Sequence, residues 1–238
     1  TMVGEVVVGL TAHAQAQIMT RQQPMKMAAA EALWNGGNGA EFSLFAVGDV
    51  SQNRNYFNIA LPKMLSVLAT NTLDGYVAGI NDVQAQYQKS YGPGDYRPNI
   101  GVTYWTFRIM IGTAFLSGLV GFIGLLLWRA GRLEKSRWFA RAAVAAVALP
   151  FIGNTAGWIF TEVGRQPWIV FGLLQTSKAA SPNVDALSVA ATLVGFTALY
   201  GVLAVVTAVL MLRIIRSGVP EDDGGQVKDE PELVLVAV

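Results

Sequence analysis

Three long apolar stretches dominate the second half of the sequence. They cover about 102–128, 138–163 and 186–212, and each exceeds the roughly 20 residues that a helix needs to cross a membrane. Residues 1–19 are also mostly apolar, but a helix of this length reaches only about 27 Å, barely the thickness of the hydrocarbon layer. We therefore expect three membrane helices, preceded at 1–19 by the end of a further membrane helix that begins upstream.

The segment 20–100 has a different pattern, in which proline and glycine punctuate polar stretches, as is typical of a loop outside the membrane. A loop of this length without structure is uncommon. We expect short helices at Pro24–Trp34, at Phe57–Leu68 with an interruption at Pro62, and at Ile80–Tyr91. The predicted fold class is therefore all-α: a multi-pass transmembrane helix bundle with an ordered extracytoplasmic loop insert.

Basic residues at the helix ends predict the orientation. The short link between the first two predicted membrane helices and the end of the third are both basic, with Arg129, Arg132, Lys135, Arg137, Arg213 and Arg216. Because positive loops stay in the cytoplasm, the insert 20–100 and the segment after Gly164 should share the outer face. The acidic residues of 217–238 predict a disordered cytoplasmic tail.

The composition indicates a membrane protein and excludes several kinds of binding site. The 238 residues are 53% hydrophobic and 14% charged, well below the roughly 25% charged residues of soluble domains. A net charge of +1 gives no support to nucleic-acid binding. The chain has no cysteine and one histidine, His13, so this chain alone offers no disulfide, thiolate site or multi-histidine metal site. The start at Thr1 lacks the basic region of a signal peptide, and we expect it to lie within a helix.

Two groups of charged residues are candidates for a site. Glu162 and Arg165 lie between two tryptophans at a predicted membrane edge. Desolvating a charged pair there is costly, so such a pair normally marks a functional site. An interfacial anchor is the alternative. Lys26 and Glu31 are five residues apart, about 140° around a helix, so they do not face each other. Two solvated surface charges are the alternative there.

Three motifs together resemble subunit I of the cytochrome bd-type quinol oxidases. They are Gly164-Arg165-Gln166-Pro167-Trp168, the pattern Pro-x-Lys-x-Ala-Ala-x-Glu at 24–31, and Phe107-Arg108-Ile109-Met110. The resemblance covers the chain up to the acidic tail, and it corresponds to the C-terminal half of a nine-helix subunit with the shorter version of the quinol-binding loop.

The resemblance implies roles for these residues. Lys26 and Glu31 would serve quinol oxidation, Met110 would be an axial ligand of the low-spin haem iron, and Arg108 would neutralise a haem propionate. Arg165, Gln166 and Trp168 would belong to the cofactor-binding region. A methionine at this position is otherwise ordinary core packing.

The family resemblance also implies the cofactors and partners. The cofactors would be low-spin haem b, high-spin haem b and haem d, and the reaction would oxidise quinol at the outer face and reduce oxygen to water. The partners would be the N-terminal half of subunit I, subunit II, small accessory subunits and membrane lipid. The location would be the bacterial cytoplasmic (inner) membrane.

Two positions depart from the family pattern. His13 stands where the family has a carboxylate before the quinol loop, and Thr155 stands where the family has a glutamate close to the other two haems. Two alternatives therefore stay open: a non-catalytic multi-pass membrane protein and a truncated, inactive paralogue.

Overall fold

The computed structural model describes residues 2–217, so the predicted acidic tail lies outside the described residues from residue 218 onward. The chain divides into two units, Thr1–Ala180 and Ser181–Val238. Each unit is considered by itself below.

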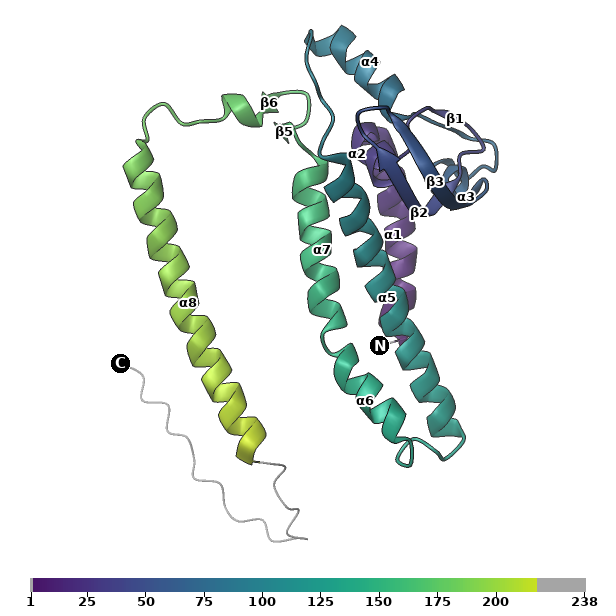
Figure 1. Ribbon diagram of the computed structural model, residues 1–238, viewed down its shortest axis with the longest axis vertical. Coiled ribbons are helices and arrows are strands. Elements are labelled where there is room, and N and C mark those ends of the chain that lie inside the picture. Colours follow the sequence, from purple (N-terminus) through teal and green to yellow (C-terminus); the bar gives the residue numbers. More distant parts are fainter. Residues whose placement is uncertain (1, 218–238) are drawn as a thin grey trace. The chain divides into compact units, whose positions relative to one another are not determined.

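Membrane-length helices form the framework of the first unit. Helix α5 (Ile100–Arg129) packs side by side with α7 (Leu149–Gly164), and α6 (Arg137–Ala146) precedes α7 (Figure 1). Among residues 2–217, three helical stretches are long and apolar enough to cross a membrane, namely Ile100–Arg129, Arg137–Gly164 and Ala186–Ser217. The predicted mostly helical fold class is therefore confirmed.

The second predicted membrane helix is broken in the middle. Its two parts are α6 and α7, and Val147 and Ala148 lie between them. Pro150 explains the break, because it has no N–H to donate to the carbonyl of Ala146 and its ring clashes with a continuing helix. In the first turn of α7 the same residue is well tolerated.

Helix α1 (Met2–Gln22) packs against the insert. It packs against α2 (Pro24–Ala30), α3 (Met64–Thr70) and α5. Within residues 2–217, α1 does not reach the hydropathy that marks the three membrane-length stretches. Its second half carries His13, Gln15 and Gln17, which explains the lower hydropathy.

The insert contains strands that the sequence pattern did not predict. An antiparallel hairpin joins β2 (Phe42–Asp49) to β3 (Arg54–Leu61), with Phe42 opposite Leu61. The predicted helix over Phe57–Leu68 is therefore wrong in its first part, and only α3 is helical. Tyr56, Phe57 and Ile59 are aromatic or β-branched, which favours a strand.

The remaining elements of the insert are short. Strand β1 (Gly37–Asn38) pairs with β4 (Tyr76–Val77), and α4 (Ile80–Tyr91) follows. After α7 the chain forms β5 (Trp168–Val170), β6 (Leu174–Gln175) and the 3-10 turn Thr176–Lys178. The second unit contributes α8 (Ala186–Ser217).

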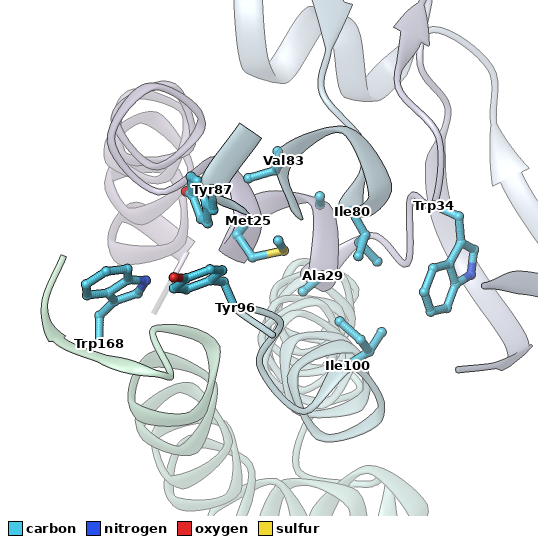
Figure 2. Packing of buried hydrophobic residues seen from close by; sticks show 10 residues of the cluster. Met25, Ala29, Trp34, Ile80, Val83, Tyr87, Tyr96, Ile100 and Trp168 are labelled. Carbon is cyan, nitrogen blue, oxygen red and sulfur yellow. The ribbon is translucent and has the colours of Figure 1, made fainter. Parts of the chain in front are cut away.

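A hydrophobic core fixes the insert to the helix ends. Met25 and Ala29 of α2 pack with residues of α4, with the first turn of α5 and with Trp168 (Figure 2). Helix α2 is buried on all sides from Met25 to Ala30, and its three alanines allow neighbouring elements to approach closely. This burial brings the two charged side chains of the 24–31 motif into the interior.

Candidate functional site

Glu31 lies at the C-terminal cap of α2 and forms a buried ion pair with Arg108 of α5. Its Oε2 accepts hydrogen bonds from Arg108 Nη2 at 2.6 Å and from the backbone N–H of Ser43 at 3.0 Å. Only 1% of the Glu31 side chain and 9% of the Arg108 side chain are exposed. The pair therefore joins the insert to a membrane-length helix.

Burial controls the acidity of Glu31. Desolvation disfavours the carboxylate and raises the pKa of Glu31 to about 7, although the Arg108 guanidinium and the Ser43 N–H act in the opposite direction. A carboxyl group that titrates near neutral pH can both take up and release a proton under working conditions.

Arg108 is held by aromatic rings as well as by Glu31. Its guanidinium carbon lies 4.8 Å from the ring centre of Phe42, 4.7 Å from that of Tyr104 and 5.2 Å from that of Phe107. Such cation–π contacts stabilise the charged form of the side chain. The guanidinium thus stays a fixed positive charge beside Glu31.

Lys26 points to the other side of α2, toward α7. Its Nζ lies 4.7 Å from the ring centre of Phe160, and its side chain crosses Gly164 so closely that a Cβ there would lie 3.1 Å from Lys26 Cγ. Burial lowers the pKa of Lys26, the nearby Arg165 lowers it further, and Glu162 raises it. The structure therefore places Lys26 and Glu31 at two separate positions, as their spacing predicted.

The Gly164–Trp168 segment presents unpartnered donors beside Lys26. Arg165 forms an ion pair with Glu162, yet Arg165 Nε and Trp168 Nε1 are buried and have no hydrogen-bond partner among residues 2–217. Both residues line a cavity of about 100 Å³ together with Lys26. Gln166 is held by Thr176, whose Oγ1 donates to Gln166 Oε1 at 2.6 Å.

Met110 lines a larger cavity of about 840 Å³ between α1, α5 and α7. Glycines let the helices approach at this point. A Cβ at Gly157 would lie 2.9 Å from Met110 Sδ, and one at Gly153 would lie 2.6 Å from Thr113 Oγ1. The volume falls in the range of cofactor sites, roughly 300–1,000 Å³.

These residues fit a haem. The thioether of Met110 is a known type of haem-iron ligand. Arg165 and Trp168 line the separate cavity of about 100 Å³, and their buried donors suit a carboxylate such as a propionate. Residues 2–217 contain no cluster of three or more His, Cys, Asp or Glu side chains that could hold a metal ion.

Two departures from the family pattern occupy different surroundings. His13 Nε2 lies 2.8 Å from Asn71 Oδ1, at the contact between α1 and the end of α3. Thr155 is exposed on α7 and does not line the Met110 cavity. Neither contacts the Glu31–Arg108 pair.

Sequence reasoning missed Ser43 and Tyr104 as neighbours of Glu31. Ser43 Oγ is 2.9 Å from Tyr104 Oη, and this contact spans 61 positions of the chain. Ser43 lies in strand β2, and an uncharged serine gives no chemical signal of its role in the sequence. The sequence also suggested a haem propionate for Arg108, which stays a prediction, and the structure shows Glu31 paired with the same guanidinium.

The fold and the site define a polytopic membrane protein whose ordered extramembrane insert buries one acid and one base at the ends of its helices. The chain belongs to the cytochrome bd terminal oxidase subunit I family, whose family model matches residues 1–219.

Characterised relatives agree with this membership. The chain is 42% identical over 217 residues to "Cytochrome bd ubiquinol oxidase subunit 1" of Bacillus subtilis (strain 168), covering 91% of this chain and 46% of that protein. It is 27% identical over 253 residues to "Cytochrome bd-II ubiquinol oxidase subunit 1" of Escherichia coli (strain K12), covering 82% of this chain and 49% of that protein. The chain thus spans about half the length of the curated relatives it matches.

A solved structure shares the fold. The bd oxidase from Geobacillus thermodenitrificans superimposes with a TM-score of 0.73 at 28% sequence identity, and the match covers 92% of this chain and 48% of that chain.

Proposed function

We propose that this chain is the C-terminal half of subunit I of a cytochrome bd-type terminal oxidase, which oxidises quinol at the outer face and passes the electrons to oxygen. The family match over residues 1–219 supports this proposal. The observation that carries it is the buried Glu31, whose pKa of about 7 suits proton uptake from a quinol hydroxyl. Lys26 would bind the quinol oxygen from the other side of α2.

The residues around Met110 support haem binding. In the complete oxidase Met110 would supply one axial ligand of the low-spin haem b, and Arg165, Gln166 and Trp168 would line its polar edge. When bound, the haem accepts electrons one at a time from quinol. Met110 would hold the iron near the insert, and Glu31 would take the quinol proton.

The remaining parts of the oxidase belong to the same proposal. The N-terminal half of subunit I, subunit II and small accessory subunits would complete the complex with high-spin haem b and haem d. The complex would lie in the bacterial cytoplasmic membrane, with the insert outside and the C-terminus in the cytoplasm.

Replacement of the two insert residues tests the quinol site. In the purified complex, Glu31→Gln should lower the kcat of quinol oxidation by about 100-fold or more, because a positioned general base contributes roughly 10²–10⁴-fold. Lys26→Met should raise KM. The matched controls Glu134→Gln and Lys89→Met change exposed side chains and should leave both constants unchanged. Full activity of Glu31→Gln with a normal haem content would rule out this site.

Replacement of Met110 tests the haem ligand. Met110→Leu conserves volume, so a packing residue should lose less than about 1.5 kcal/mol of stability. A ligand should instead lose the low-spin haem signal in the reduced-minus-oxidised spectrum and show a lower midpoint potential. Met64→Leu, in the insert, is the control. An unchanged spectrum and midpoint potential in Met110→Leu would show that Met110 is a packing residue and not a ligand. An absence of haem bands in the unaltered complex would favour a non-catalytic membrane protein.

A further inference from the structure

A polar cavity lies on the hairpin side of Glu31, and no role above uses it. Its volume is about 240 Å³, and the lining includes Glu31, Glu41, Ser43, Arg54, Asn55 and Asn58. At about 30 Å³ for each water molecule, this space is sufficient for several hydrogen-bonded waters. Of these lining residues, Glu31 is buried and Glu41 is exposed to solvent.

We propose that this cavity is the exit route for quinol protons, and that Glu41 is the group that passes them from Glu31 to the outer solution. The inference rests on the proposed function, since it assumes that Glu31 receives the proton. It adds a relay residue at the surface and a direction for proton release.

Hydrogen bonds connect the residues that line the cavity between Glu31 and Glu41. Ser43 contacts Glu31 through its backbone N–H, and its Oγ lies 2.9 Å from Asn58 Oδ1. Asn58 Nδ2 in turn donates to Glu41 Oε1 at 2.5 Å. An amide side chain does not carry protons as an acid, so Ser43 and Asn58 would orient the cavity waters while the two carboxylates exchange the protons.

The opposite side of Glu31 is occupied by Arg108. Arg108 keeps its proton in proteins and occupies both carboxylate oxygens of Glu31, with Nη1 to Oε1 at 3.3 Å and Nη2 to Oε2 at 2.6 Å. The aromatic rings of Phe42 and Tyr104 lie over the same guanidinium. A proton on Glu31 therefore leaves more easily through the polar cavity than past Arg108.

The surrounding charges favour release. Arg108 is the positive group paired with Glu31, and Glu41 is the negative group that shares the cavity lining. The exposed Arg54 of the same lining lies over the ring of Tyr56. When Glu31 is protonated, Arg108 lacks its counter-charge, and loss of the proton restores the ion pair. The Arg108 charge thus favours return of Glu31 to its carboxylate form after each transfer, against the desolvation that raises its pKa.

The chemistry balances for each turnover. Oxidation of one quinol breaks two O–H bonds and gives a quinone, two protons and two electrons. A haem held by the complete oxidase would supply the electron acceptor. Each proton forms an O–H bond on Glu31, passes to a cavity water, then to Glu41, and finally to the outer solution.

The test uses the purified whole complex with Glu41→Gln. The expected result is a several-fold lower kcat, an unchanged KM and haem spectrum, and a larger solvent deuterium isotope effect on kcat, because proton release becomes limiting. Glu41→Asp should restore most of the rate. Asp74→Asn, which also removes an exposed carboxylate from the insert, should match the unaltered complex in rate and isotope effect.

A second variant blocks the route without touching a carboxylate. Asn58→Leu places an apolar side chain in the lining and should give the same slower, isotope-sensitive turnover. If Glu41→Gln and Asn58→Leu both keep the original kcat and isotope effect while Glu31→Gln is inactive, the exit route is wrong and the quinol site stands. If Glu31→Gln is itself fully active, the proposed function fails first.

Discussion

At the scale of single residues, Glu31 shows what sequence reasoning can and cannot reach. The spacing of Lys26 and Glu31 predicted two side chains that do not pair, and the structure places them on different sides of α2. The partner of Glu31 is Arg108, which is 77 positions away. No helical periodicity relates residues at such a separation, so this pair emerges only when the insert packs on α5.

Removal of Arg108 should be costly. Arg108→Gln leaves a buried carboxylate without its counter-charge, and breaking such a pair typically costs about 3–5 kcal/mol. The double variant Arg108→Gln with Glu31→Gln should recover much of this loss, and a double-mutant cycle of unfolding free energies measures the coupling. Arg97→Gln, which breaks the more exposed Asp95 pair, should cost less than about 1 kcal/mol. Equal losses in both single variants would contradict the buried pair.

Glu31 should also make stability depend on pH. Its pKa is raised from the ordinary value of 4.5 to about 7 in the folded protein. Between pH 4.5 and about pH 7, the folded state therefore binds more protons than the unfolded state. The stabilising contribution of the neutral carboxyl is therefore complete below about pH 4.5 and is lost as the pH rises through about 7. Thermal unfolding midpoints of the complex should fall over this window, and the difference between the complex and its Glu31→Gln variant should report the loss. A pH-independent difference would argue against titration of Glu31.

At the scale of elements, length and hydropathy predicted the membrane-length helices but not their internal breaks or the strands. The stretch 138–163 is mostly apolar, so its pattern predicted one continuous helix. In the structure Pro150 interrupts the helical hydrogen bonds, and the stretch forms two helices, α6 and α7. In the insert, Pro62 suggested an interrupted helix, and the stretch rich in aromatic and β-branched residues that precedes it forms β3. Local backbone chemistry decided both differences.

Pro150→Ala should close the break. The new N–H at residue 150 can bond to the carbonyl of Ala146, and one net hydrogen bond of about 1 kcal/mol should slow amide exchange around 147–152 roughly fivefold. Hydrogen–deuterium exchange of the complex, read by mass spectrometry, measures this change. Val147→Ala lies in the same break but keeps the proline, so its exchange should stay fast. Equal protection in the two variants would assign the break to a cause other than Pro150.

At the scale of the whole chain, the apolar pattern was sufficient to predict the fold class, because spanning helices need only length and hydropathy. The ordered insert was also expected, from its length and its helix-forming segments. The sequence pattern could not supply the packing of the insert on the helix ends, since Met25, Ile80, Ile100 and Trp168 come from four distant segments. Side chains of this kind carry no signal of their partners.

The absence of cysteine from the sequence allows a direct test of orientation. Single substitutions Ser90→Cys in the insert and Lys135→Cys in the α5–α6 link both lie at exposed positions. A membrane-impermeant maleimide applied to intact bacteria, with the outer membrane permeabilised where there is one, should label Ser90→Cys alone, and lysis should expose Lys135→Cys as well. The reverse labelling pattern would invert the proposed topology.

The contact between Gly157 and Met110 also has an evolutionary consequence. A methyl group at position 157 would lie 2.9 Å from the Met110 sulfur, so the thioether would have to move before any other residue could occupy that position. Sequence changes at these two positions should therefore be correlated during divergence. Homologous chains that carry a side chain at 157 are expected to have replaced Met110, or to have separated α5 from α7 through larger residues nearby.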